Sequence, residues 1–324
     1  MNKRHFLFAA VAVASLSAAA PTAAIAQGGP AAGQPLKIIV ATPAGGASDT
    51  AARLLAQALA RNLGRQVLVD NKPGGNGVPA VQAVLTAPAD GQTLLWAMSS
   101  MAGMPLLVKS SPVKSLTEFT PVAPVVNLMY GVFVNPKVPA STVEELSAHL
   151  KANPGKLSYG TGVLSEYMVT EHFLHAAGAK ALRVPYKGGA QLMPDLISGE
   201  LQFNIGPLVP ALPHVKSGKL RLLATLPGRT EVIAGVPSLA QAGIATDTLP
   251  TWNGLVAPPG TPQDVAARLA REVNDALGDP ALRAALEAQG LRVSGGTPQQ
   301  MGAAIESAAA VWQQFVRDYN IPQE

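Results

Sequence analysis

The stretch KIIVATPAGGASDTAARLLAQALARNL, residues 37–63, begins with the pattern of a buried strand and ends with the pattern of a helix. Residues 37–41 are mostly branched and apolar, whereas residues 49–63 repeat leucine at every fourth position, which places the leucines on one helical face. Ser48 is the expected N-cap of this helix. A strand, a glycine-rich turn and a helix in this order form the building unit of an α/β sheet.

Strand and helix patterns alternate along the rest of the chain. Further strands are predicted at residues 67–69, 93–98, 157–159, 202–205 and 220–225. Helix starts are predicted from three capping signals, which are Ser141 with Glu144, residues 261–264, and Thr297 with Gln300. This alternation predicts an α/β fold with mainly parallel sheets flanked by helices.

The domain organisation follows from what the sequence lacks. It contains no repeat of fixed period and no long low-complexity linker, so two lobes joined by a chain that crosses between them fit better than two domains in series. The expected crossings are residues 119–134 and 220–228. One lobe is therefore expected to hold residues 27–127 and 227–324, and the other to hold residues 128–226.

The N-terminus has the pattern of a targeting segment. A positive start at Lys3 and Arg4 precedes an apolar run over residues 6–20, and small residues then end at Ala26. This order is typical of a secretory signal peptide, here residues 1–26 with cleavage after Ala26. An uncleaved membrane anchor is disfavoured because the run falls short of the roughly 20 residues that a spanning helix needs. We therefore expect an exported protein.

Composition excludes several functional classes. The 324-residue chain has no cysteine, which removes disulfide scaffolds, thiolate metal sites and cysteine nucleophiles. Its 24 Lys and Arg residues against 20 Asp and Glu residues leave a net charge of +4 without a basic block, so no nucleic-acid-binding surface is expected. Apolar residues make up 48% of the chain, which is enough to bury a core.

Side-chain patterns give little support to catalysis or to a metal centre. The sequence has neither a Gly-x-Ser-x-Gly elbow nor a His-Glu-x-x-His motif, and no carboxylate pair stands out as an acid–base couple. His172 and His175, with Glu171, have the spacing of metal ligands on a helix, but an ordinary solvated helix face is favoured. Core packing is the expected role of the tryptophans, although Trp96 lies near a predicted strand end and is kept as a site candidate.

Four small-residue turns each follow a predicted strand and precede a helical stretch. They are TPAGGASD at residues 42–49, NKPGGNG at 71–77, YGTG at 159–162 and VPYKGG at 184–189. Glycines bring backbone N–H groups to one point and a helix N-terminus adds partial positive charge, so such turns can bind anions. The first turn lacks the lysine of a P-loop and the spacing of a dinucleotide fingerprint. An anion site and a plain turn both stay open for it, and a plain turn is favoured for the second.

Eight motifs follow one another along almost the whole exported chain. They are PAGGASDTAARLLA (43–56), VDNKPGGNG (69–77), ADGQTLL (89–95), FTPVAPV (119–125), VPYKGGAQLMPDLISGE (184–200), GKLRLLAT (218–225), GVPSLAQAG (235–243) and WNGLVAPPGTP (252–262). In this order they resemble the Bug-type extracytoplasmic solute receptors that serve tripartite tricarboxylate transporters.

The resemblance implies a two-lobed periplasmic binding protein of the type II-like, Venus-flytrap class, with a mainly parallel sheet in each lobe. Such a receptor captures a small carboxylated ligand between its lobes and delivers it to membrane transporter subunits. It is not an enzyme, it uses no cofactor or metal, and we expect a monomer. The candidate ligand-binding residues are Thr42, Ala44, Gly45, Gly46, Ser48, Asp49, Trp96, Ser99, Gly160, Thr161, Gly162, Tyr167, Tyr186, Lys187, Gly188, Gly189 and Asn204.

The chain departs from the family pattern at three positions around the expected pocket. Thr42 stands where an aromatic residue is usual, Tyr167 where a histidine is usual, and Gly189 where a serine or threonine is usual. The resemblance therefore does not carry over the identity of the ligand. Two other functions stay open, which are a periplasmic ligand sensor that feeds a two-component system and, less favoured, an exported small-molecule enzyme.

Overall fold

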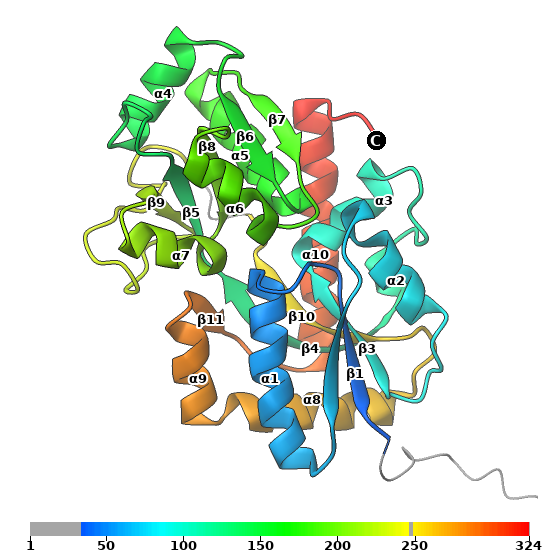
Figure 1. Cartoon of the computed structure of the whole chain (residues 1–324). Coiled ribbons are helices and arrows are strands. Elements are labelled where there is room, and N and C mark those ends of the chain that lie inside the picture. The colour runs from blue at the N-terminus through cyan, green and yellow to red at the C-terminus, as the bar shows by residue number, and fades with distance from the viewer. Residues whose placement is uncertain (1–33, 246–248, 324) are drawn as a thin grey trace, which may run out of the picture.

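The computed structural model describes residues 34–245 and 249–323. The predicted signal peptide, residues 1–26, and its cleavage site after Ala26 lie outside these residues. Within the described ranges, no helix has both the length and the apolar character that a membrane span requires. Two separate sheets flanked by helices make up the fold, which confirms the predicted two-lobed α/β architecture (Figure 1).

The first sheet has six strands in the order β11-β4-β10-β3-β1-β2. Their bounds are β1 Leu36–Val40, β2 Val67–Asn71, β3 Thr93–Met98, β4 Thr120–Leu128, β10 Trp252–Ala257 and β11 Leu291–Val293. Strand β1 runs parallel to β2 and β3, with Ile38 paired with Val69 on one side and Leu94 on the other. Every residue of β1 except Lys37 is buried, as expected for a strand covered by helices on both faces.

The second sheet has five strands in the order β7-β6-β8-β5-β9. Their bounds are β5 Tyr130–Val134, β6 Ser158–Thr161, β7 Leu182–Pro185, β8 Phe203–Pro207 and β9 Arg221–Leu226. Strand β6 is parallel to β7 and β8, whereas β5 is antiparallel to β8 and β9.

Both sheets are therefore mixed rather than mainly parallel. The chain leaves the first sheet along β4 and enters the second along β5, with Met129 alone between them, and it returns from β9 to β10. The exit and return strands lie side by side and run in opposite directions, as β4 and β10 do in the first sheet and β5 and β9 do in the second. The parallel pairs are β1 with β2 and β3, before the first crossing, and β6 with β7 and β8, between the two crossings.

Helices pack on both sheets, and one of them spans the two. Their bounds are α1 Ala47–Leu63, α2 Val78–Leu85, α3 Met104–Leu107, α4 Val143–Ala152, α5 Leu164–Ala177, α6 Gly189–Ser198, α7 Leu208–Lys216, α8 Gln263–Leu277, α9 Pro280–Glu287 and α10 Pro298–Tyr319. Helix α10 packs on β4 and extends towards the second sheet (Figure 1). There Phe315 meets Tyr167 of α5 edge to face, with 6.2 Å between ring centroids.

The start of α1 differs from the prediction. Gly46 is the N-cap, and Ser48 lies within the first helical turn. The hydroxyl of Ser48 is committed elsewhere, since it donates to Asn253 Oδ1 at 2.7 Å. The carboxylate of Asp49, the third helical residue, instead accepts the Gly45 N–H at 3.0 Å. A side chain inside the helix therefore satisfies a backbone donor at its N-terminus.

Capping differs at two other helices and agrees at one. At α4 the predicted pair Ser141 and Glu144 is replaced by its neighbours, because Thr142 is the N-cap and accepts the Glu145 N–H at 3.2 Å. Both pairs have the residue types of a capping box, and the helix begins one residue later than predicted. Helix α8 follows Pro262 without a side-chain cap. The capping box predicted for α10 is confirmed.

Candidate functional site

The turns that follow β1, β3, β6 and β7 meet in a cleft between the two sheets. Two adjoining cavities lie in it. The large cleft cavity has a volume of about 160 Å³ and the small cleft cavity one of about 30 Å³. Both are lined by Met98, Ser100 and Val163, so segments from both sheets enclose each cavity.

The structure brings about half of the predicted site residues to these walls. Those that line one of the cavities are Thr42, Gly46, Ser48, Ser99, Gly162, Tyr186, Lys187 and Gly189. Those that line neither are Ala44, Gly45, Asp49, Trp96, Gly160, Thr161, Tyr167, Gly188 and Asn204. Residues 74–77 of the second glycine turn, where a plain turn was favoured, also line the large cleft cavity.

Several of the residues behind the walls hold the walls in place. Asn204 Nδ2 donates to the carbonyl oxygen of Gly160 at 2.9 Å. The hydroxyl of Thr161 accepts a hydrogen bond from Arg183 Nε at 3.1 Å. The guanidinium of Arg183 also stands 3.9 Å above the centroid of the Tyr167 ring. Tyr167 therefore supports the second sheet and contacts a cation of the protein itself.

Three helix N-termini converge on the small cleft cavity. The N-caps of α1, α5 and α6 are Gly46, Val163 and Gly188, and Gly46, Val163 and Gly189 line the cavity. The first N–H groups of a helix have no partner within it, and the helix dipole adds partial positive charge there. Three such ends at one cavity favour an anion there without requiring a cationic side chain.

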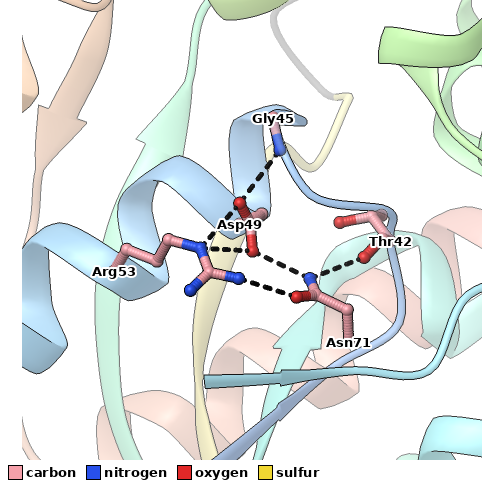
Figure 2. A network of polar contacts seen from close by, with 5 residues as sticks. All are labelled: Thr42, Gly45, Asp49, Arg53 and Asn71. Carbon is pink, nitrogen blue, oxygen red and sulfur yellow. Dashed lines mark hydrogen bonds and ion pairs between the residues drawn. The ribbon is translucent and has the colours of Figure 1, made fainter. Parts of the chain in front are cut away.

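Asp49 fixes the shape of the first turn (Figure 2). Its carboxylate accepts the Gly45 N–H at 3.0 Å, Asn71 Nδ2 at 2.8 Å and Arg53 Nε at 3.0 Å. Asn71 Nδ2 also donates to the carbonyl oxygen of Thr42 at 2.9 Å, which ties both ends of the turn together. Burial raises the pKa of Asp49, but hydrogen bonds from Arg53, Asn71 and Gly45 outweigh it and hold that pKa below 3.8.

Asn253 anchors a second polar group beside the cavity. Its Oδ1 accepts from the Ser48 hydroxyl at 2.7 Å and from Trp96 Nε1 at 2.9 Å. Its Nδ2 donates to the carbonyl oxygen of Trp252 at 2.8 Å, which fixes the orientation of the amide. Trp96 is fully buried, so it orients Asn253 and packs in the core. The motif that contains Asn253 was visible in the sequence, but the residue itself was missed.

Glu166 was also missed, and among the described residues it is the one carboxylate in the wall of the small cleft cavity. Its side chain is buried, and Oε2 accepts the Gly162 N–H at 2.5 Å. Burial raises the pKa of Glu166 to about 7, against smaller opposing effects of the Gly162 and Val163 N–H groups. Nearby, the hydroxyls of Tyr130 and Ser165 pair at 2.8 Å on the same wall.

Across the cleft, the two lobes approach each other closely. A β-carbon added to Gly188 would lie 2.5 Å from Pro43 Cδ of the first turn, closer than any real contact. Within the second lobe, a β-carbon on Gly162 would lie 2.2 Å from the backbone nitrogen of Gly189. Glycine is therefore required at Gly188 for the close approach of the two lobes, and at Gly162 for the packing of two turns of one lobe.

The histidines considered as metal ligands have other partners. His172 Nδ1 lies 2.8 Å from the hydroxyl of Tyr319, and Nε2 lies 2.7 Å from the carbonyl oxygen of Ala245. Among residues 34–245 and 249–323, no group of three or more His, Asp or Glu side chains is placed to hold a metal ion.

Comparison with known proteins agrees with this geometry. Residues 51–321 match the family described as the tripartite tricarboxylate transporter family receptor. Protein BugT of Bordetella pertussis is 33% identical over 290 residues, which cover 88% of this chain and 89% of BugT. A solved periplasmic transporter protein is 34% identical, with a TM-score of 0.84 over 90% of this chain and 98% of its own. R. palustris Rpa4515, solved with adipate, is 28% identical, with a TM-score of 0.84 over 89% of this chain and 98% of its own.

The family match covers every strand except β1 and includes the turns that follow β3, β6 and β7, and the similarity to BugT extends over most of both proteins. The chain therefore belongs to the tripartite tricarboxylate transporter receptor family.

Proposed function

We propose that this protein is a periplasmic receptor that captures a small carboxylate in the cleft and delivers it to the subunits of a tripartite membrane transporter. The observation that carries the proposal is the meeting of three helix N-termini at the small cleft cavity. Family membership supports it, and the similarity to Rpa4515, solved with adipate, supports a carboxylate ligand.

Backbone donors suffice for useful affinity. A hydrogen bond from a backbone N–H to a carboxylate contributes about 1.5–3 kcal/mol net, because the acceptor is charged. Three such bonds with some apolar burial exceed the roughly 8 kcal/mol of a micromolar complex. Ordering of the ligand and closure of the lobes offset the surplus.

Closure couples binding to delivery. We assign residues 27–127 and 227–324 to one lobe and residues 128–226 to the other, with the ligand held by turns of both. A ligand that contacts both lobes only in the closed form shifts the equilibrium towards that form. The closed monomer is then the species that the transporter subunits recognise.

A thermal-shift screen tests the proposal on protein purified from the periplasm. The probes are di- and tricarboxylates, amino acids, and aromatic and heterocyclic acids. An acid present at about 100 times its Kd adds about 2.7 kcal/mol, which raises the melting midpoint by several degrees. A stabilising acid that is recovered unchanged supports a receptor. Turnover of the acid supports an enzyme instead, and a lack of response to every acid overturns the proposal.

A further inference from the structure

A buried carboxyl group is an unexpected component of an anion-binding cavity. Glu166 is the third residue of α5, its relative exposure is 1%, and it lines the small cleft cavity. Its Oε2 accepts the Gly162 N–H at the N-terminus of α5. Glu166 thereby places the protein's own carboxylate at the N-terminus of α5, as Asp49 does at α1, so α6 is left for the carboxylate of a ligand.

The other side chains described in the cavity wall carry no charge. Its polar side chains besides Glu166 are those of Thr42, Ser48, Ser99, Ser100, Tyr130, Ser165 and Asn253, and apolar residues and glycines complete it. Within the described residues, this wall includes no Lys, Arg or His. A buried carboxylate without a cationic partner is unfavourable unless a bound molecule supplies one.

The second carboxylate oxygen lies beside Gly189. Glu166 Oε1 lies 3.0 Å from the point that a β-carbon on Gly189 would occupy, so a side chain at this position would crowd the carboxylate. Both residues line the small cleft cavity. A donor group of a ligand that enters this cavity therefore meets the carboxyl group of Glu166.

We propose that Glu166 is a specificity-determining residue that selects acids carrying a hydrogen-bond donor next to the carboxylate, with an ammonium group preferred over a hydroxyl group. The inference rests on the proposed function. The ligand carboxylate lies at the N-terminus of α6, and its donor group faces Glu166. An acid without a donor places two negative charges in one small cavity, where the low dielectric strengthens their repulsion. Amino acids are therefore the preferred class, then hydroxy acids, then plain acids.

The test uses two matched series on protein purified from the periplasm at about pH 8, where Glu166 is ionised. One series is succinate, malate and aspartate, and the other is glutarate, 2-hydroxyglutarate and glutamate. Calorimetric titration is expected to give a Kd at least about tenfold lower for the amino acid than for the plain acid of the better-binding series. Glu166→Gln is expected to reduce this ratio about tenfold or more, because the donor then faces a neutral acceptor. Glu306→Gln, an exposed position on α10, removes one carboxylate elsewhere and is expected to leave the ratio unchanged.

Lowering the pH provides a second measurement that does not depend on folding of a variant. Burial raises the pKa of Glu166 to about 7, so at about pH 6 the group is mostly protonated while the dicarboxylates stay mostly ionised, and the ratio in the wild-type protein is expected to fall as it does in Glu166→Gln. A plain acid that binds as tightly as its amino counterpart, or a ratio unaffected by both the substitution and the pH, overturns the assignment of Glu166 and leaves the receptor function intact. Failure of all six acids to bind overturns the inference. The thermal-shift screen with the wider set of acids then tests the receptor function separately.

Discussion

Replacing Glu166 with Gln should remove a pH-dependent loss of stability from the ligand-free protein. The carboxyl group ionises near pH 4.5 in the unfolded chain, whereas burial raises its pKa to about 7 in the folded protein. Between these values the folded state binds more protons than the unfolded state, so the free energy of unfolding falls as the pH rises. At about 1.4 kcal/mol for each tenfold change in proton affinity, the wild-type protein loses about 3 kcal/mol across this interval.

Urea unfolding at about pH 5 and about pH 8 measures the effect, with Glu306→Gln as the control. The free energy of unfolding of Glu166→Gln, relative to the wild-type protein, is expected to rise by about 2–3 kcal/mol from the lower to the higher pH, and the control is expected to show no such rise. The amide keeps an acceptor for the Gly162 N–H, so the variant should fold. A difference that stays constant with pH would mean that Glu166 titrates like a solvated carboxyl group, and the description of a dry, uncompensated carboxylate in the small cleft cavity would be refuted.

Three further substitutions test the cleft and its supports. Gly188→Val places a side chain against Pro43 in the closed form, so we expect a larger radius of gyration in X-ray scattering and a smaller ligand-induced thermal shift. The control is Gly302→Ala on α10, whose β-carbon would meet nothing closer than 3.6 Å, and it should change neither quantity. Asp49→Ala should lower the free energy of unfolding by about 3 kcal/mol, measured by urea unfolding at neutral pH. The pKa of Asp49 lies below 3.8 in the folded protein, so its carboxylate stabilises the protein above that pH. This stabilisation is lost as the pH falls through the folded-state pKa, where the free energies of unfolding of the two proteins should become similar. Asn253→Leu leaves the Ser48 hydroxyl and Trp96 Nε1 without their acceptor and should lower the free energy of unfolding by about 2–3 kcal/mol. A decrease below about 0.5 kcal/mol would contradict the role given to this amide.

Local patterns in the sequence were sufficient for most of the elements. The predicted strand at residues 93–98 coincides with β3, because a short apolar run with turn residues before it leaves no other pairing surface. The capping box of α10 was predicted because its two side chains and two backbone donors lie within four residues. The mixed direction of the sheets was not predictable in the same way, since it depends on the exit strand β4 lying beside the return strand β10, two segments far apart in the sequence.

The same distinction separates the predicted from the missed residues of the site. Gly46 and Gly162 belong to turns whose composition alone indicates exposed N–H groups beside a helix start. Tyr130, Glu166 and Asn253 stand on two strands and a helix, where the sequence pattern is that of an ordinary core or capping residue. They become site residues only because the two sheets face each other across the cleft, and no local signal encodes that relation.

In the proposed receptor, backbone groups bind the ligand carboxylate and side chains select the ligand. Backbone N–H groups are supplied by every residue type except proline, so in the proposed receptor the helix ends can hold a carboxylate whatever side chains surround them. The side chains that project into the small cleft cavity are free to vary without loss of that hold, and Glu166 alone among them carries a full charge. Substitution of Glu166 should therefore change which acid is preferred more than whether an acid binds, whereas Gly188→Val, which prevents closure, should weaken all acids alike. A Glu166→Gln protein whose affinity fell equally for every acid would contradict the idea that the helix ends bind the carboxylate while Glu166 selects the ligand.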